Sequence, residues 1–378
     1  MGKRTLLSKR FLYSFFAILV LITISSIETV QYHTLSGRKI SEDVLDKFLI
    51  GKMGALQMPG LSFALINNGK VVYSRSLGIG NLETKSSVNQ QSIFEAASLS
   101  KPLFAYFTLK MVERGLLALD TPLYKYLPYK DIEVDERYKL ITARMVLSHQ
   151  SGFPNWRYFD KRDEKLHRYG DLYLKFTPGT MFSYSGEGYF YLSKVLAYLN
   201  GLDIATLDAL FQKDVAKSLG LTNSWFSGNN YITQHKVSGY SKGKKVEKKW
   251  PTSFPDQDST WFGAAGGLHT NAEDYSRFLI ALMKEKGLSK KKFKELFKEQ
   301  VKLPPDAPQK NDGEAAWALG MAIMPVSYGN LYAHGGNNGD FQSGFVINKE
   351  NASGYVFFTN CDQGAAFNKK LKLLLTSK

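Results

Sequence analysis

One dipeptide constrains the fold of this chain more than any other feature. Residues 60–78, GLSFALINNGKVVYSRSLG, hold Asn68-Gly69 between two runs rich in apolar and β-branched residues. A two-residue type I′ turn needs positive φ at both central positions, and Asn-Gly meets that need well. The segment therefore predicts two antiparallel strands joined by a tight hairpin.

The remaining segments predict helices in the middle of the chain and strands near its end. Helical spacing or apolar runs with capping residues predict helices at 43–57, 98–115, 142–148, 186–200, 204–218, 272–286 and 363–375. Strand-like runs occupy 317–325, 330–336, 343–350 and 354–360. We expect an α+β fold in which an antiparallel sheet is flanked by helices and an all-helical region is inserted into it. One domain would span 43–378, with the sheet part at 43–118 and 315–378 and the helical part at 119–314.

The amino terminus has the pattern of an export signal. MGKRTLLSKR is cationic, and residues 11–27 are apolar or small throughout. Within residues 1–30 we therefore expect an N-terminal hydrophobic helix, which is either a cleaved signal peptide or an uncleaved membrane anchor. A linker would follow at 31–42. In both cases the domain is exported, and in the second case residues 11–27 contact the membrane.

Charge and cysteine content exclude few classes of protein. The formal net charge is +15, with lysine-rich runs at 241–250 and 284–300. These runs form either a surface for anionic partners or a solvated lysine face, and the Glu residues interleaved in the second run favour the solvated face. No nucleic-acid-binding motif accompanies them, so we expect no nucleic-acid partner. Cys361 is the only cysteine, which excludes a disulfide framework and a cysteine metal cluster.

The motif S-x-x-K occurs four times, and only its context separates the copies. The copy at Ser98 and Lys101 is the one that begins a strongly apolar helix. Residues i and i+3 share one face of a helix, and a helix N-terminus presents unpaired N–H groups. A buried lysine there would lose its proton more easily and could activate the serine. The alternative is a serine cap followed by a solvated lysine.

Two further stretches carry candidate polar residues. Tyr184 falls in a turn that opens an apolar helix, where a phenol can pass a proton. His334 ends a strand-like run and is followed by two glycines that allow close approach. Each residue taken singly is more often a packed aromatic side chain or a loop-end residue.

Together these stretches resemble the serine β-lactamase and penicillin-binding-protein family, above all its class C β-lactamase, D-stereospecific peptidase and esterase branch. The family has S-x-x-K at a helix start, Y-x-N in the helical region, and K-T-G or H-x-G on a strand. Here they stand as Ser98-Leu99-Ser100-Lys101, Tyr184-Ser185-Gly186 and His334-Gly335-Gly336. The resemblance extends over about residues 43–375 and includes the stretches 59–84, 145–154, 264–279 and 354–360.

The resemblance implies acyl transfer without a metal or an organic cofactor. Ser98 would attack a carbonyl, while Lys101 and Tyr184 would move the proton. Backbone N–H groups of Ser98 and Asn337 would form the oxyanion hole. The substrate-binding residues would be His334, Gly335, Gly336 and Gly186, and the substrate would be a small-molecule or peptide ester or amide.

Two departures from the family pattern favour an esterase or a D-stereospecific peptidase over a β-lactamase. Gly186 replaces the usual asparagine amide, and His334 replaces a lysine that would supply a permanent cation. His149 in LSHQSG resembles a family turn with a structural role, and Trp156 is either part of an apolar substrate wall or core packing. The alternative function is a catalytically idle scaffold that binds cell-wall peptide or another anionic partner.

Overall fold

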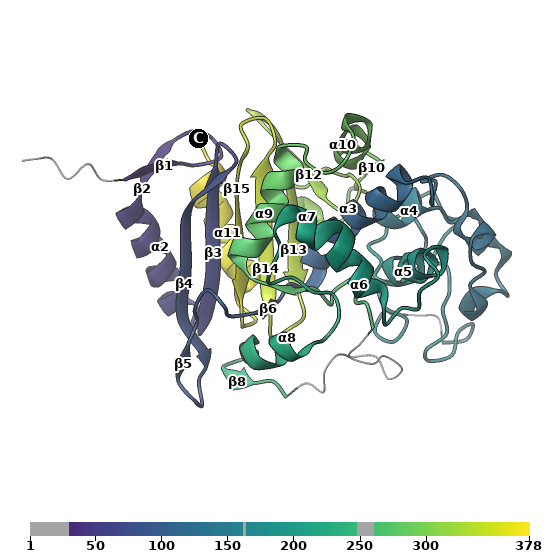
Figure 1. Cartoon of the computed structure of the whole chain (residues 1–378), viewed down its shortest axis with the longest axis horizontal. Helices are drawn as coiled ribbons and strands as arrows, with labels where there is room; N and C mark the ends of the chain where they lie inside the picture. The colour runs from purple at the N-terminus through teal and green to yellow at the C-terminus, as the bar shows by residue number, and fades with distance from the viewer. Residues whose placement is uncertain (1–29, 162–163, 248–260) are drawn as a thin grey trace, which may run out of the picture.

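The computed structural model describes residues 30–161, 164–247 and 261–378 (Figure 1). The predicted signal peptide or anchor at 11–27 lies outside these residues. Within them, no helix has the length and apolar character needed to cross a bilayer.

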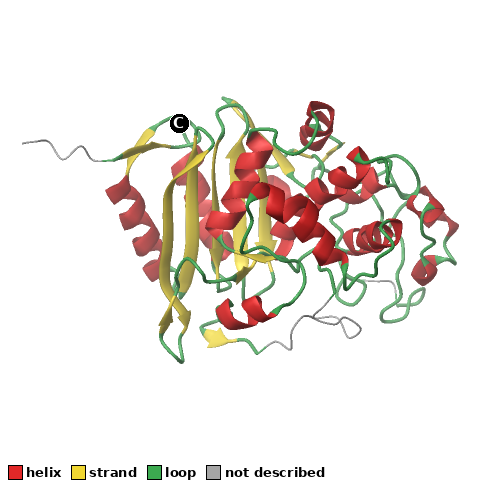
Figure 2. Ribbon diagram, viewed as in Figure 1, coloured by secondary structure: helices red, strands yellow, loops and turns green. Residues whose placement is uncertain are grey.

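A long antiparallel sheet dominates the described part of the chain, with the helical region beside it (Figures 1 and 2). Its strands follow the spatial order β10-β11-β12-β13-β14-β15-β3-β4-β5, so strands from both ends of the domain meet where β15 pairs with β3. The strands are β3 Gly60–Asn67, β4 Lys70–Asn81, β5 Ser86–Ser87, β10 Val301–Lys302, β11 Ala316–Trp317, β12 Ala322–Val326, β13 Gly329–Asn337, β14 Gln342–Asn348 and β15 Ser353–Thr359. Short pairs form between β1 Gln31–His33 and β2 Lys39–Ser41, β6 Phe94–Glu95 and β9 His269–Thr270, and β7 Tyr240–Ser241 and β8 Lys244–Lys245.

The helices cover both faces of the sheet and form the region beside it. They are α2 Glu42–Ala55, α3 Ser100–Glu113, α4 Ala143–Leu147, α5 Glu187–Leu199, α6 Leu207–Phe211, α7 Lys217–Leu219, α8 Asn230–His235, α9 Ala272–Met283, α10 Lys290–Phe297 and α11 Gly364–Thr376. Short 3₁₀ turns are η1 Ala97–Leu99, η2 Leu123–Lys125, η3 Lys130–Ile132, η4 Glu136–Leu140 and η6 Pro308–Asp312, and a π turn, η5 Gln212–Ala216, joins α6 to α7.

Alternating side chains explain why helices cover both faces. In β3, Phe63 and Leu65 join the apolar cluster under α2 and α11, whereas Ala64 and Ile66 join the cluster under α9. Successive strand residues point to opposite faces, so a strand buried on both sides is apolar throughout. Every residue of β3 is buried. The central strands are therefore held from two sides, which makes the sheet a rigid base for residues at its rim.

The hairpin predicted from Asn68-Gly69 is present. Asn68 has a φ of 52° and Gly69 a φ of 64°, and β3 pairs with β4 on either side of them. Both central residues are left-handed, as a type I′ turn requires. The antiparallel sheet flanked by helices confirms the α+β prediction.

Residues 31–42, predicted to be a linker, instead form the β1–β2 hairpin and the first residue of α2. Their apolar side chains explain the difference, because Tyr32, Leu35 and Ile40 are buried in the cluster under α2 and α11. Ser41 then caps α2 by accepting a hydrogen bond from the Val44 N–H. The folded domain therefore begins before residue 43.

Two other predicted boundaries differ from the structure. The strand expected at 317–325 is split into β11 and β12 by a turn in which the Ala318 N–H donates to the Met321 carbonyl. The helical part expected at 119–314 includes α9 and β10, but α9 packs on β3 and β15, and β10 is a strand of the large sheet. The apolar side of α9, with Tyr275 and Phe278, needs the sheet to cover it.

Two glycine substitutions should change stability in opposite directions. Gly69→Ala should lower the free energy of unfolding by about 1–2 kcal/mol, because alanine is strained at a left-handed φ. Gly51→Ala should raise it by about 0.5–1 kcal/mol, since Gly51 is exposed within α2 and an added Cβ meets no atom within 4 Å. Chemical denaturation of both variants measures this. Equal effects of the two substitutions would contradict the assigned backbone conformations.

Candidate active site

Ser98 sits in the 3₁₀ turn η1, which leads directly into α3. The residue before it, Ala97, has a φ of 49°, a left-handed conformation that costs about 1–3 kcal/mol for a non-glycine residue. The Ser100 hydroxyl donates to the Ala97 carbonyl at 2.6 Å and accepts from the Leu268 N–H at 3.0 Å. Ser98 is half-buried. The turn that carries Ser98 is therefore strained at Ala97 but is held by two hydrogen bonds of the Ser100 hydroxyl, and it leaves Ser98 partly exposed.

The end of β13 lies directly against this turn. Ser343, which lies on the neighbouring strand β14 and pairs with Gly336, donates its hydroxyl to the Ala96 carbonyl at 2.7 Å. A Cβ on Gly336 would fall 2.5 Å from the same carbonyl oxygen and 3.2 Å from the Ala97 side chain. Glycine at 336 therefore allows the strand to approach the serine turn closely, which explains the second glycine of His334-Gly335-Gly336 in physical terms.

The Lys101 amine lies within hydrogen-bonding distance of the serine. Its Nζ donates to Ser98 Oγ at 3.1 Å and to the Ala265 carbonyl at 2.7 Å. The side chain is 1% exposed, and no carboxylate in the described part of the chain pairs with it. Burial lowers the pKa of Lys101 to about 7. A large fraction of the amine is therefore neutral at physiological pH and can accept a proton.

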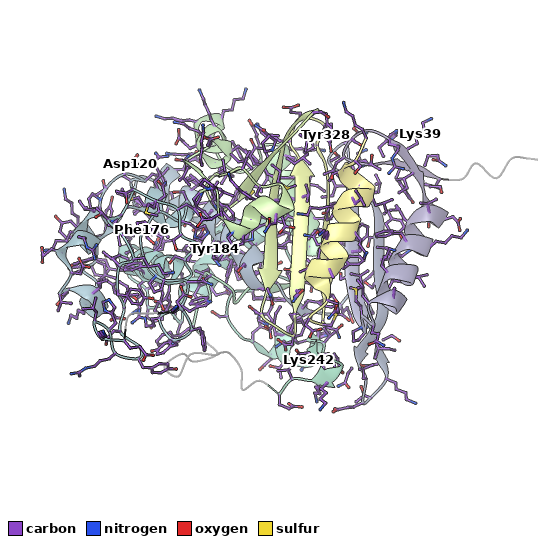
Figure 3. The ribbon with its side chains drawn as sticks, turned by 180° about the vertical axis from the view of Figure 1, so that it is seen from behind. Lys39, Asp120, Phe176, Tyr184, Lys242 and Tyr328 are labelled. Atoms are coloured by element: carbon purple, nitrogen blue, oxygen red, sulfur yellow. The ribbon has the colours of Figure 1, made fainter. Side chains whose placement is uncertain are left out.

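Tyr184 completes the group at the boundary between the sheet and the helical region (Figure 3). Lys101 Nζ lies 4.7 Å from the centre of its ring. Burial raises the pKa of Tyr184, and the neighbouring Ser98 hydroxyl opposes part of that rise. The phenol therefore keeps its proton at neutral pH and can act as a proton donor.

His149 holds the Tyr184 ring in place. The two rings stack with centroids 4.1 Å apart, and His149 Nδ1 accepts a hydrogen bond from the Ser185 N–H at 3.0 Å. Burial, followed by the nearby Lys101 charge, keeps the pKa of His149 well below its usual value. The neutral ring therefore carries its proton on Nε2. The structural role expected for His149 thus includes packing on Tyr184.

His334 lies beside Tyr184 as a neutral ring. It is 3% exposed, and its Nδ1 donates to the Gly335 carbonyl at 2.7 Å, which leaves Nε2 with a lone pair. Burial first, and then the Lys101 charge, lowers the pKa of His334 to about 3. The ring lies 6.0 Å from Tyr184 and 5.4 Å from Trp317, measured between centroids. This position therefore supplies no cation at neutral pH.

The remaining candidate residues lie at the end of β13. Gly335 and Asn337 are exposed, and Asn337 pairs with Gln342 in the sheet. The Asn337 side chain is turned toward the strand end, where its Oδ1 accepts from the Gly339 N–H at 2.8 Å. The oxyanion hole formed by the N–H groups of Ser98 and Asn337 stays a prediction.

Gly186, the third residue of the Y-x-N position, lies under an indole ring. A Cβ on Gly186 would fall 2.6–2.8 Å from three ring carbons of Trp156. The Gly186 N–H donates to Asn155 Oδ1 at 3.0 Å, so the two segments are joined at this point. The missing amide side chain is thus replaced by an aromatic ring from a different part of the chain.

Three contacts of the site were not identified from the sequence: the Ala265 carbonyl on Lys101, Trp317 against His334, and Trp156 over Gly186. The first is a backbone group, which has no residue signature. Only the contact of Trp156 with Gly186 has a signal in the sequence. A glycine two residues after Tyr184 leaves a space that a side chain from another segment must fill.

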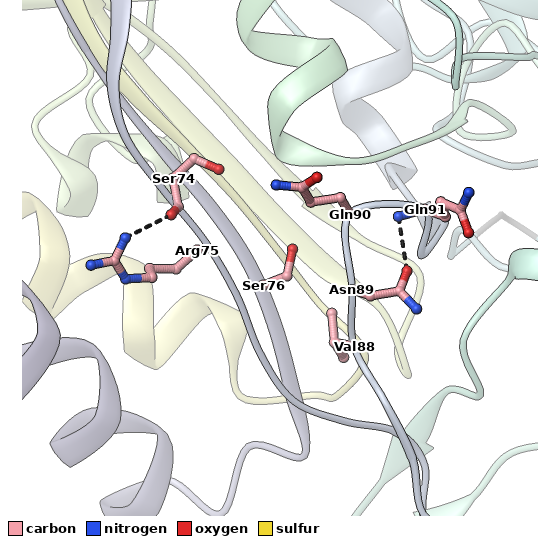
Figure 4. Close-up of a pocket in the computed structure, with 7 residues that line it drawn as sticks. All are labelled: Ser74, Arg75, Ser76, Val88, Asn89, Gln90 and Gln91. Carbon is pink, nitrogen blue, oxygen red and sulfur yellow. Dashed lines mark hydrogen bonds between the residues drawn. The ribbon is translucent and has the colours of Figure 1, made fainter.

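A separate hollow of about 540 Å³ lies between β4 and residues 88–91 and includes none of these residues (Figure 4). The residues that line it include the polar Ser74, Ser76, Gln90 and Gln91. The Arg75 guanidinium there is already committed to Glu42 and Asp46 on α2. Within residues 30–161, 164–247 and 261–378, no group of three His, Cys, Asp or Glu side chains could hold a metal ion.

Comparison with known families gives one match that covers nearly the whole domain. The family model described as Beta-lactamase matches residues 45–377. The chain is also similar to the octameric penicillin-binding protein homologue from Pyrococcus abyssi, with a TM-score of 0.73 at 22% identity, over 90% of this chain and 78% of that one. At this identity the similarity shows the fold alone.

Two curated relatives match more locally. Esterase EstB of Burkholderia gladioli is 29% identical over 192 residues, which are 45% of this chain and 47% of the relative. Protein flp of Staphylococcus aureus strain NCTC 8325 is 22% identical over 247 residues, which are 63% of this chain and 48% of the relative. The matched residues thus span about half the length of these curated relatives.

The pKa of Lys101 predicts how the rate of serine acylation depends on pH. Only the neutral amine accepts a proton, so kcat/KM for an ester should rise with pH and level off above about 7. His334 stays neutral over this range and adds no second step. Stopped-flow acylation rates at constant ionic strength measure the profile. A flat profile between about pH 5 and 9 would contradict Lys101 as the base.

Lys101→Met should stabilise the folded protein. The folded-state pKa of Lys101 is lower than the unfolded one, so the unfolded state binds more protons between them. The penalty for burying the amine is therefore complete below about pH 7 and disappears as the pH rises toward the unfolded value of about 10.4. Denaturation of both proteins at acidic and at alkaline pH should show a stability difference that shrinks with rising pH. A constant difference would contradict the depressed pKa.

Proposed function

The chain belongs to the β-lactamase family, and we propose that it is an exported serine hydrolase that forms an acyl-enzyme on Ser98. The observation that carries the proposal is the 3.1 Å contact between Lys101 Nζ and Ser98 Oγ, made by an amine with no carboxylate partner in the described chain. A lysine buried in this way without a catalytic role would only destabilise the fold.

In the first step, Ser98 Oγ attacks the substrate carbonyl while Lys101 takes the serine proton. The contact distance suits direct transfer, and a pKa of about 7 suits a general base near neutral pH. The carbonyl oxygen becomes an oxyanion, for which we propose the N–H groups of Ser98 and Asn337 as donors. The Ala265 carbonyl holds the ammonium formed on Lys101.

Collapse of the tetrahedral intermediate breaks the bond to the leaving group, which needs a proton. Tyr184 is protonated at neutral pH and lies next to Ser98, so it can donate that proton. We propose that the proton taken up by Lys101 then returns to the phenolate, which restores both groups; the amine lies 4.7 Å from the centre of the Tyr184 ring. Water then attacks the acyl-enzyme by the reverse sequence, and Ser98 regains its hydrogen.

The charges of the site favour a neutral ester or amide over a β-lactam. His334 carries no charge at neutral pH, so the position where K-T-G members of the family have a lysine offers no ion pair to a substrate carboxylate. The amide of Y-x-N is also absent at Gly186. Similarity to a protein named an esterase agrees with this preference. We therefore propose esterase or D-stereospecific peptidase activity ahead of β-lactamase activity.

A chromogenic panel tests the proposal. Wild type should hydrolyse 4-nitrophenyl esters or D-amino-acid anilides faster than nitrocefin, since the site lacks a cation for the carboxylate. Ser98→Ala should lower kcat by about a thousandfold or more, and Tyr184→Phe by about a hundredfold, because the hydroxyl and the phenol act in the reaction itself. Circular dichroism of each variant controls for folding. Equal turnover by folded wild type and Ser98→Ala would contradict the enzyme assignment and support an idle binding scaffold.

A further inference from the structure

The segment that carries Trp156 is fixed to the start of α5 on both sides of the indole. Before it, the Asn155 carbonyl accepts from the Gly186 N–H at 3.0 Å. After it, Arg157 pairs with Glu187 at 2.9 Å, and both side chains are largely buried. These contacts fix the segment of Trp156 next to Gly186. Little conformational entropy is therefore lost at Trp156 when a ligand binds.

The indole lies against the chain two residues beyond Tyr184. Ser185 points into the protein, where its Oγ donates to the Pro154 carbonyl at 2.8 Å and the side chain is 1% exposed. Gly186 follows as the N-cap of α5, and the space that a side chain there would take is filled by the Trp156 ring.

Part of the Trp156 side chain is exposed to solvent. Trp156 packs on the core but is only half-buried. Further apolar side chains lie nearby in the chain and face solvent, because Phe159 is 60% and Met181 55% exposed. A half-buried indole held against Gly186, two residues after Tyr184, offers apolar surface that gains free energy when another flat apolar group packs on its exposed part.

We propose that Trp156 is a specificity-determining residue, which replaces the side chain missing at Gly186 and selects substrates with an aromatic or other flat apolar group next to the scissile bond. The proposal rests on the hydrolase function proposed above. In place of a hydrogen bond from an amide, this site supplies a stacking surface. The substrate class that fits is a neutral ester or amide with an aromatic substituent.

Two matched substrate pairs test the proposal. One pair varies the acyl group, 4-nitrophenyl acetate against 4-nitrophenyl phenylacetate. The other varies the alcohol, methyl acetate against benzyl acetate, whose alcohols are similar in acidity. Wild type should prefer the aromatic member of at least one pair, and Trp156→Ala should lower that kcat/KM ratio about tenfold or more. Trp156→Phe should give an intermediate ratio.

The control is Tyr198→Ala, which removes an exposed aromatic ring near the far end of α5, about 18 Å along the helix from Gly186. Its ratios should equal those of wild type. Ratios unchanged by Trp156→Ala in both pairs, in a protein that still hydrolyses esters through Ser98, would overturn the proposal. Absence of any Ser98-dependent hydrolysis or fluorophosphonate labelling in wild type would instead overturn the proposed function.

A double substitution tests the steric relation directly. Gly186→Asn alone should lower labelling of Ser98 by a fluorophosphonate, because its Cβ collides with the indole. Adding Trp156→Ala should restore labelling, since the collision partner is gone. If Gly186→Asn labels as fast as wild type while Trp156 is present, the indole does not occupy that space and the proposal fails.

Discussion

Removing the Lys101 amine from water is unfavourable, and the other parts of the site are arranged around that burial. Helix α3 carries the lysine into the core, where its Nζ contacts the Ala265 carbonyl, Ser98 Oγ and the face of the Tyr184 ring. None of these partners is an anion at neutral pH, so the pKa of the amine falls to about 7. The same burial that weakens the fold at this position therefore provides a base beside the serine.

Distant segments of the chain keep this arrangement rigid. The serine turn is held in a left-handed conformation at Ala97, and β13 can approach it because Gly336 has no side chain. Tyr184 is fixed from the helical region by the His149 ring, while His334 comes from the sheet. Because each residue is packed from a different element, the geometry depends on the whole domain. The site is bordered on one side by the large sheet, which has nine strands in the described part of the chain, and on the other by the helical region.

Much of the fold could be predicted from local signals. Asn68-Gly69 identified the hairpin, and apolar runs identified β13 to β15 and most helices. The β1–β2 hairpin was missed because its apolar residues are few and widely spaced, and only the sheet face beneath them explains their burial. In the site, spacing alone could place Lys101 beside Ser98, but the Trp156 ring over Gly186 depends on a contact between segments 30 residues apart. Contacts of that kind arise from packing and have no pattern within one segment.

The most direct measurement is the location of the acyl group during turnover. Wild type would be mixed with 4-nitrophenyl acetate, quenched in acid during the initial burst and digested for peptide mapping by mass spectrometry. We expect one acetyl group on Ser98 that appears with the burst of nitrophenol and is absent after active-site blocking. Turnover accompanied by acetyl groups on surface lysines alone, with Ser98 unmodified at every time point, would contradict the central claim.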